Sequence, residues 1–118
     1  MKKFIVATMA LVLATTALSA SARELSTKEK SIIEVVAKAK LKDPDSAKFT
    51  WQDYKGGEIY CAHVNAKNSY GGYAGNALLM VAIKSNPKGE IISAEASVDS
   101  GEMEEMMAPI CRDAGYQA

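Results

Sequence analysis

The sequence predicts a small α+β domain: an N-terminal helix, a four-stranded antiparallel sheet and a C-terminal helix, closed by one disulfide. Apolar residues recur at helical spacing near both ends of the chain that follows the first 22 residues. Between these ends lie four segments in which apolar and polar residues alternate, or in which apolar residues are nearly continuous, as is typical of strands. Turns that contain glycine or proline separate these segments. Because antiparallel sheets often carry their helices on one side, we expect both helices on one face.

Residues 1–22 have the pattern of a cleavable secretory signal. Lys2 and Lys3 precede an apolar stretch, and the segment ends in small residues, Ala20-Ser21-Ala22. A membrane-spanning helix is the alternative, but the stretch is shorter than the roughly 20 apolar residues of a span and contains threonines. No cysteine near the cleavage point offers a lipid anchor. We therefore expect a mature domain of residues 23–118, periplasmic or secreted and without a stable membrane anchor after cleavage, in a Gram-negative bacterium.

The charge balance gives no reason to expect a nucleic-acid partner. The chain has 14 basic and 14 acidic residues, and loss of Lys2 and Lys3 leaves 12 against 14, a net charge of −2. Residues 90–118 hold seven of the acidic residues and one basic residue, Arg112. This acidic end is interpreted as a solvated helix face, with a basic partner as the alternative.

Two cysteines in an exported chain predict a disulfide between Cys61 and Cys111. The bond closes a loop of roughly 50 residues, which the chain-entropy account values at about 4 kcal/mol. We expect it to supply a large share of the stability of so small a domain.

The first helix is predicted over residues 25–42. Ser26 and Glu29 have capping-box spacing, and Asp43-Pro44 ends the pattern. Glu34 and Lys38 form a favourable i, i+4 pair. The apolar stripe on one side is predicted from Ile32, Val35, Val36 and Ala39, and Ile33 widens it.

Four strands are predicted over residues 48–54, 58–64, 77–84 and 90–98. Phe49 and Trp51 share one face of the first strand. Gly56-Gly57 suits a two-residue hairpin turn, because both residues accept positive φ. Residues 86–89 form a turn with Pro87 at its second position.

A last helix is predicted after Asp99 and Ser100, either of which could cap it, with a kink or break at Pro109. Three acids suit the positive end of its dipole, with a hard cation as the weaker alternative: Glu102, Glu104 and Glu105. One apolar face is predicted from Met103, Met106, Met107, Ile110 and Cys111. We interpret this face as core, with a soft-metal or adaptable binding surface as the alternative.

His63 is the single histidine and lies two residues from Cys61 on one face of a strand. A thiol–imidazole enzyme is one hypothesis, but oxidation of Cys61 in an exported protein would remove the nucleophile. No second histidine and no Cys-x-x-Cys pair offers a metal site. We therefore expect no catalytic residue, no metal and no cofactor.

The segment from Asn65 to Gly75, called here the glycine–tyrosine loop, has more glycine and tyrosine than a connection between strands requires. Rigid aromatic rings mixed with adaptable polar groups are typical of binding surfaces, and loops on rigid scaffolds often carry function. A purely structural loop is the alternative. The predicted ligand-binding residues are Asn65, Lys67, Asn68, Tyr70 and Tyr73.

Two segments together carry a resemblance to a known family: Leu41-Lys-Asp-Pro-Asp-Ser-Ala-Lys-Phe49 and, after Cys61, Val64-Asn-Ala-Lys-Asn-Ser-Tyr-Gly-Gly-Tyr-Ala-Gly75. They resemble a family of small exported proteins and lipoproteins of bacteria and prophages. The resemblance covers the middle third of the chain and implies an exported small domain, with no activity attached. Many such proteins look lipid-anchored, but this chain lacks their lipobox cysteine.

The leading hypothesis is a non-enzymatic binding or inhibitor-like module of the bacterial envelope that uses the glycine–tyrosine loop. Its partner would be an envelope or toxin protein, or a cell-wall glycan. A small periplasmic enzyme using Cys61 and His63 is the second hypothesis. A structural component of an envelope or secretion complex is the third.

Overall fold

The structure, a computed structural model, describes residues 22–99 and 101–118. Residues 1–21, which make up all but the last residue of the predicted signal segment, lie outside these ranges, and so does Ser100. The elements are α1 (Thr27–Lys38), the 3-10 turn η1 (Pro44–Ser46), β1 (Lys48–Thr50), β2 (Ile59–Asn65), β3 (Ala77–Ser85), β4 (Ile91–Val98) and α2 (Glu104–Asp113). The predicted α+β fold is confirmed. Within these ranges, no helix is long and apolar enough to cross a membrane.

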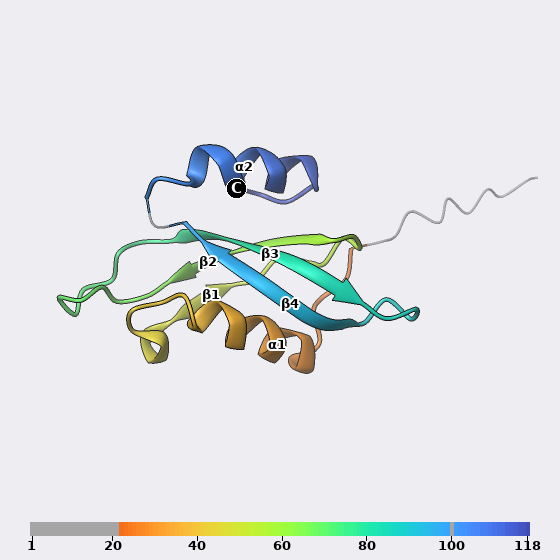
Figure 1. Ribbon diagram of the computed structural model, residues 1–118, viewed down its shortest axis with the longest axis horizontal. Helices are drawn as coiled ribbons and strands as arrows, with labels where there is room; N and C mark the ends of the chain where they lie inside the picture. Colours follow the sequence, from red (N-terminus) through yellow and green to blue (C-terminus); the bar gives the residue numbers. More distant parts are fainter. Residues whose placement is uncertain (1–21, 100) are drawn as a thin grey trace, which may run out of the picture.

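The strands form one sheet in the order β1-β2-β3-β4, and all neighbours are antiparallel. Figure 1 shows α1 and α2 on opposite sides of this sheet, so the prediction of helices on one face is wrong. Strand alternation explains the result. The side chain of Cys61 points to α2, so Tyr60 and Ala62 point to the opposite face, and all three are fully buried. A sheet with two apolar faces needs a cover on each.

The capping box of α1 is confirmed. Ser26 Oγ accepts from the Glu29 amide at 3.1 Å, and Glu29 Oε1 accepts from the Ser26 amide at 2.9 Å. The helix ends at Lys38 rather than at residue 42, and Glu34 and Lys38 pair at 3.8 Å. The predicted apolar stripe is displaced: the side facing the sheet centres on Ile33 and Ala37, whereas Val35 is 70% exposed.

Glu29 also joins α1 to the start of β4. Glu29 is buried, with 4% of its surface exposed. Its two carboxylate oxygens accept hydrogen bonds from Arg23 Nη1 and Nη2 at 2.6 Å each. Glu29 Oε2 also accepts from the Ile91 amide at 2.9 Å. The Arg23 hydrogen bonds are the main reason that the pKa of Glu29 falls from 4.5 to about 2. Sequence analysis identified Glu29 as a capping residue and missed this ion pair.

The β1–β2 hairpin opens in its middle. The register, with Phe49 opposite Val64, is that of a two-residue Gly56-Gly57 turn, as predicted, and both glycines have positive φ. However, β1 ends at Thr50 rather than at residue 54. The buried Tyr60 hydroxyl takes the place of the missing ladder, because it accepts from the amide and donates to the carbonyl of Gln52 at 2.9 and 2.6 Å.

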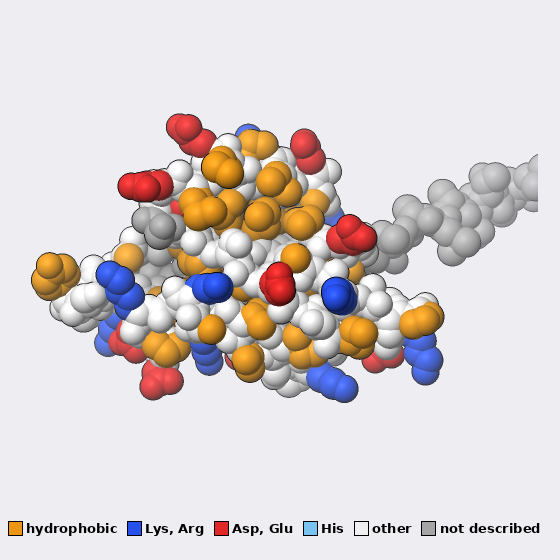
Figure 2. Space-filling model, in the orientation of Figure 1, with side chains coloured by type: hydrophobic (Ala, Val, Ile, Leu, Met, Phe, Trp, Pro, Cys, Tyr) orange, Lys and Arg blue, Asp and Glu red, His pale blue; other side chains and the backbone are white. Residues whose placement is uncertain are grey.

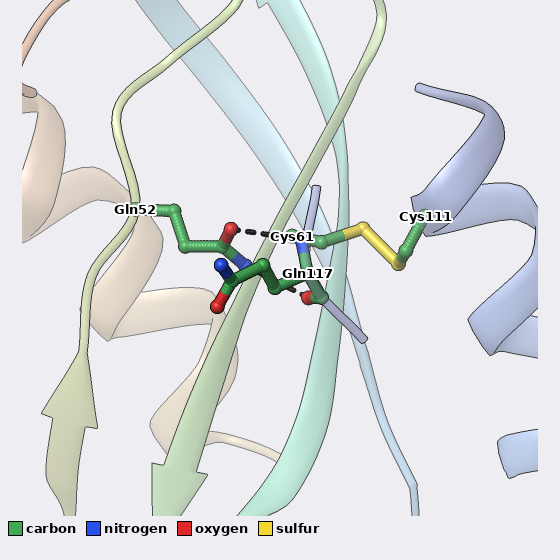
Figure 3. Close-up of a disulfide and its surroundings, with 4 residues drawn as sticks. All are labelled: Gln52, Cys61, Cys111 and Gln117. Atoms are coloured by element: carbon green, nitrogen blue, oxygen red, sulfur yellow. Dashed lines mark hydrogen bonds between the residues drawn. A yellow bond between two sulfur atoms is a disulfide. The ribbon is translucent and has the colours of Figure 1, made fainter. Parts of the chain in front are cut away.

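The C-terminal tail lies beside this opening. The predicted Cys61–Cys111 disulfide is confirmed, with the two Cα atoms 5.9 Å apart. Beside it, the side-chain amide of Gln52 exchanges two 2.9 Å hydrogen bonds with the backbone of Gln117 (Figure 3). The Cys61–Cys111 disulfide fits a protein of a non-cytoplasmic compartment, where disulfides persist.

The helix α2 is one continuous element with Pro109 inside it, so the predicted break is absent from this segment. Pro109 and Glu105 are both exposed, and water can therefore reach the Glu105 carbonyl that loses its helical partner. Met103 is the N-cap residue. Asp99 does not cap the helix. Its Oδ1 accepts from the amides of Gly101 and Met103 and shapes the preceding turn.

Candidate functional site

The glycine–tyrosine loop extends the β2–β3 hairpin beyond the sheet. The amide of Ala74 donates to the Ala66 carbonyl at 3.2 Å, and Lys67 and Tyr73 form an antiparallel bridge. The loop is therefore a short β-hairpin with defined cross-strand contacts, which follows the alternation of the two strands that lead into it.

Asn68 organises the tip of this hairpin. Its amide donates to the Gly72 carbonyl at 2.8 Å, and its Oδ1 accepts from the amides of Tyr70 and Gly72 at 2.9 and 3.3 Å. Asn65 acts in the same way at the base, where its Oδ1 accepts from the Gly75 amide at 3.2 Å. The oxygens of both predicted ligand-binding asparagines are thus used inside the loop.

Tyr73 and Lys67 fasten the loop to η1. The Tyr73 hydroxyl donates to the Ser46 carbonyl at 3.2 Å, and the Lys67 amide donates to Ser46 Oγ at 2.8 Å. The Tyr73 ring lies 4.5 Å from Lys48 Nζ and 5.7 Å from Lys67 Nζ. These cation–π contacts and hydrogen bonds hold the ring against the domain.

Tyr70 differs from the other predicted site residues. It lies at the tip of the hairpin and is 97% exposed, whereas Tyr73 is 42% exposed. The structure therefore brings Lys67 and Tyr73 together at the base of the loop and presents Tyr70 alone at its end. Sequence analysis found all five residues but did not separate the supporting ones from the exposed one.

A pocket of about 280 Å³ lies at the base of the loop, and we call it the lysine pocket. Three lysines line it: Lys40 and Lys42 after α1, and Lys67 from the loop. Val64 and Val98 are among its apolar lining residues. The amino-acid sequence gives no sign of this pocket, because its walls are separated along the chain and only the folded sheet brings them together.

Asn68→Ala should loosen the tip without unfolding the domain. The change removes the acceptor for the Tyr70 and Gly72 amides, so their hydrogen exchange should accelerate by about tenfold or more. Amides of β3 should keep their wild-type exchange rates. Ser69→Ala is the matched exposed control, and equal exchange of the Tyr70 amide in both variants would contradict the role of Asn68.

The thiol–imidazole hypothesis loses its nucleophile. Cys61 is bonded to Cys111, and the described residues contain no free cysteine. His63 is half-buried on the same face of β2. Among residues 22–99 and 101–118, no group of three or more His, Cys, Asp or Glu side chains lies close enough to hold a metal ion.

The α2 methionines do not share one buried face. Met107 and Cys111 are buried, but Met103, Met106 and Ile110 are 38%, 68% and 45% exposed, so the core interpretation is wrong for these three. Figure 2 shows hydrophobic side chains gathered over α2, with acidic side chains around them. The exposed three are called the α2 stripe below.

Comparisons of the chain with protein families, with curated proteins and with solved structures found no match. The candidate site therefore rests on its own geometry.

Proposed function

We propose that this chain is a small exported, non-enzymatic binding or inhibitor-like module whose contact surface is the glycine–tyrosine loop. The observation that carries the proposal is Tyr70, which is 97% exposed at the end of an internally bonded hairpin. An exposed aromatic ring on a structured loop offers a partner a flat amphipathic contact surface that is already held in place.

The construction of the loop supports recognition. A tyrosine has few rotatable bonds, so it loses little conformational entropy on binding. The Asn68 and Ser46 hydrogen bonds order the loop before any partner arrives. Preorganisation of this kind reduces the entropic cost of association.

The disulfide and the predicted signal support action in the periplasm or outside the cell. A target in that space would be an envelope or toxin protein, or a cell-wall glycan. The resemblance to small bacterial and prophage exported proteins agrees with this setting.

The test is capture of a target from periplasmic extract by immobilised wild-type and Tyr70→Ala domains. A ring that acts as the anchor is worth about 2 kcal/mol or more, so the variant should bind its target at least roughly 30-fold more weakly. Val35→Ala is the matched control, because Val35 is 70% exposed on α1 and should leave capture unchanged. Equal retention of the target by wild type and Tyr70→Ala would move the interface away from the loop.

A structural component of a larger envelope complex is the second candidate, and the α2 stripe favours it. Exposed methionines adapt to partner surfaces, and Met106 is 68% exposed. Under this alternative, Met106→Ser would abolish capture and Tyr70→Ala would not.

A further inference from the structure

The edge of β4 has a row of unpaired backbone groups. Among the described residues, β4 pairs with β3 alone. The Asp99 amide donates across to the Leu78 carbonyl at 2.9 Å. Because residues of an antiparallel strand alternate in this respect, Val98, Ala96 and Ala94 turn their amides and carbonyls outward. In Figure 1, β4 lies between the two helices at the front of the sheet.

A groove of about 520 Å³ runs along this edge between α1 and β4. One side of the groove is formed by Val36 of α1 and by Ala39 and Lys40, which follow the helix, and residues 94–97 of β4 form the other side. Ala94 and Ala96 are buried, each 8% exposed, and their side chains lie on the sheet face that α1 covers, while both residues line the groove.

The groove leads to the lysine pocket. Lys40 lines both of them, and Val98, at the end of β4, lines the pocket. Asp99 is the single acidic residue of the pocket lining, and its Oδ1 accepts from the amides of Gly101 and Met103. Three lysines against one acid favour an anionic group at this end of the groove.

We infer that β4 accepts an extended peptide as a fifth strand, with the C-terminal carboxylate of the peptide in the lysine pocket. The backbone of Ala94, Ala96 and Val98 supplies the hydrogen bonds of strand addition. Lys40, Lys42 and Lys67 supply the charge that selects a free carboxylate. Since β4 runs toward the pocket, the added peptide runs parallel to β4.

This inference rests on the proposed binding function and names a class of partner for it, because the glycine–tyrosine loop forms one wall of the lysine pocket. A second copy of the chain fits less well. Twofold symmetry would pair two β4 strands in antiparallel directions, and that arrangement brings no chain terminus to either lysine pocket.

The probe is an acetylated pentapeptide of alternating threonine and valine that ends in alanine, made with a free C-terminal carboxylate or as the amide. Amide chemical shifts of the full mature domain are followed by NMR. We expect the shifts of Ala94, Ala96 and Val98 to move, and the free acid to bind about fivefold more tightly than the amide, as an exposed ion pair allows. Added salt should reduce that preference.

Two changes separate the parts of the inference. Lys40→Ala with Lys42→Ala should bind acid and amide peptides about equally, because Lys67 alone then stands against Asp99 in the pocket while the edge of β4 stays intact. Of two peptides N-methylated on one or the other set of alternate amides, the one whose methylated amides face β4 should not bind, because it cannot donate to the outward carbonyls. Failure of the free-acid peptide to move the β4 shifts at about 1 mM would overturn the inference, as would a wild-type dimer with protected β4 amides.

Tyr70→Ala distinguishes this inference from the proposed function. The variant should bind the probe peptide as wild type does, because Tyr70 does not line the groove or the lysine pocket. If wild type does not bind the probe peptide but captures its target through Tyr70, the strand-addition inference is overturned and the proposed function stands. If the target is captured equally well without Tyr70 and the probe peptide still binds, the loop is not the contact surface and the strand-addition inference stands.

Discussion

Replacing Cys61 and Cys111 together with alanine should lower the free energy of unfolding by about 4 kcal/mol. The bond closes a loop with a sequence separation of 50 residues, and release of that constraint increases the entropy of the unfolded chain by this amount. Both cysteines are fully buried, so alanine avoids placing a hydroxyl or a lone thiol between α2 and β2. Urea unfolding of wild type and the double variant measures the difference.

Reduced wild type is the control for the missing sulfur atoms, because it retains the side chains and loses only the bond. Its midpoint should fall about as far as that of the double variant. A loss below about 1 kcal/mol in both would contradict the role assigned to the disulfide and leave the attachment of α2 to packing alone.

Glu29→Gln should lower the free energy of unfolding at neutral pH by about 3 kcal/mol. The folded pKa of Glu29 is about 2, against an ordinary value of 4.5, and each unit of difference corresponds to about 1.4 kcal/mol. Because the pKa is lowered in the folded state, this stabilisation is complete above about pH 4.5 and is lost as the pH falls toward 2. Glutamine has one acceptor oxygen in place of two, so it removes the charge together with one set of the hydrogen bonds that Glu29 accepts from Arg23, Ser26 and Ile91, much as protonation of Glu29 does.

Unfolding free energies measured from pH 7 down to pH 2 check this sign. The difference between wild type and Glu29→Gln should shrink toward zero at the acid end. Glu24→Gln is the matched control, since Glu24 is exposed in the same segment, and it should follow the wild-type curve. A wild-type advantage that stays constant with pH would contradict the Arg23 ion pair as its source.

The features predicted from sequence were those with local causes. The Ser26–Glu29 capping box and the β1–β2 register were predicted correctly, because spacing over a few residues determines each of them. The disulfide was predicted because only two cysteines were present.

The errors had tertiary causes. The Tyr60 hydroxyl forms hydrogen bonds with the backbone amide and carbonyl of Gln52 in place of a strand neighbour. β1 is therefore shorter than its sequence pattern indicates. The helices lie on opposite faces because both sides of β2 are apolar, and apolar runs do not specify which helix covers which face. The α2 stripe was assigned to the core because its spacing is that of a buried helix face.

The candidate site divides in the same way. Composition was enough to find the glycine–tyrosine loop, but not to show that Asn68 supports Tyr70 or that Tyr73 packs against Lys48. The lysine pocket joins residue 40 to residue 67 and residue 98. Such a set becomes visible only after the sheet order and the position of α1 are known.

The most direct test of the contact loop is photo-crosslinking in cells that produce the chain. A benzophenone amino acid replaces Tyr70 in one variant, Met106 in a second and Val35 in a third; all three positions are exposed. We predict one dominant adduct from position 70 and none of the same mass from positions 106 and 35. An adduct from position 106 or 35 with none from position 70 would contradict the loop as the binding surface.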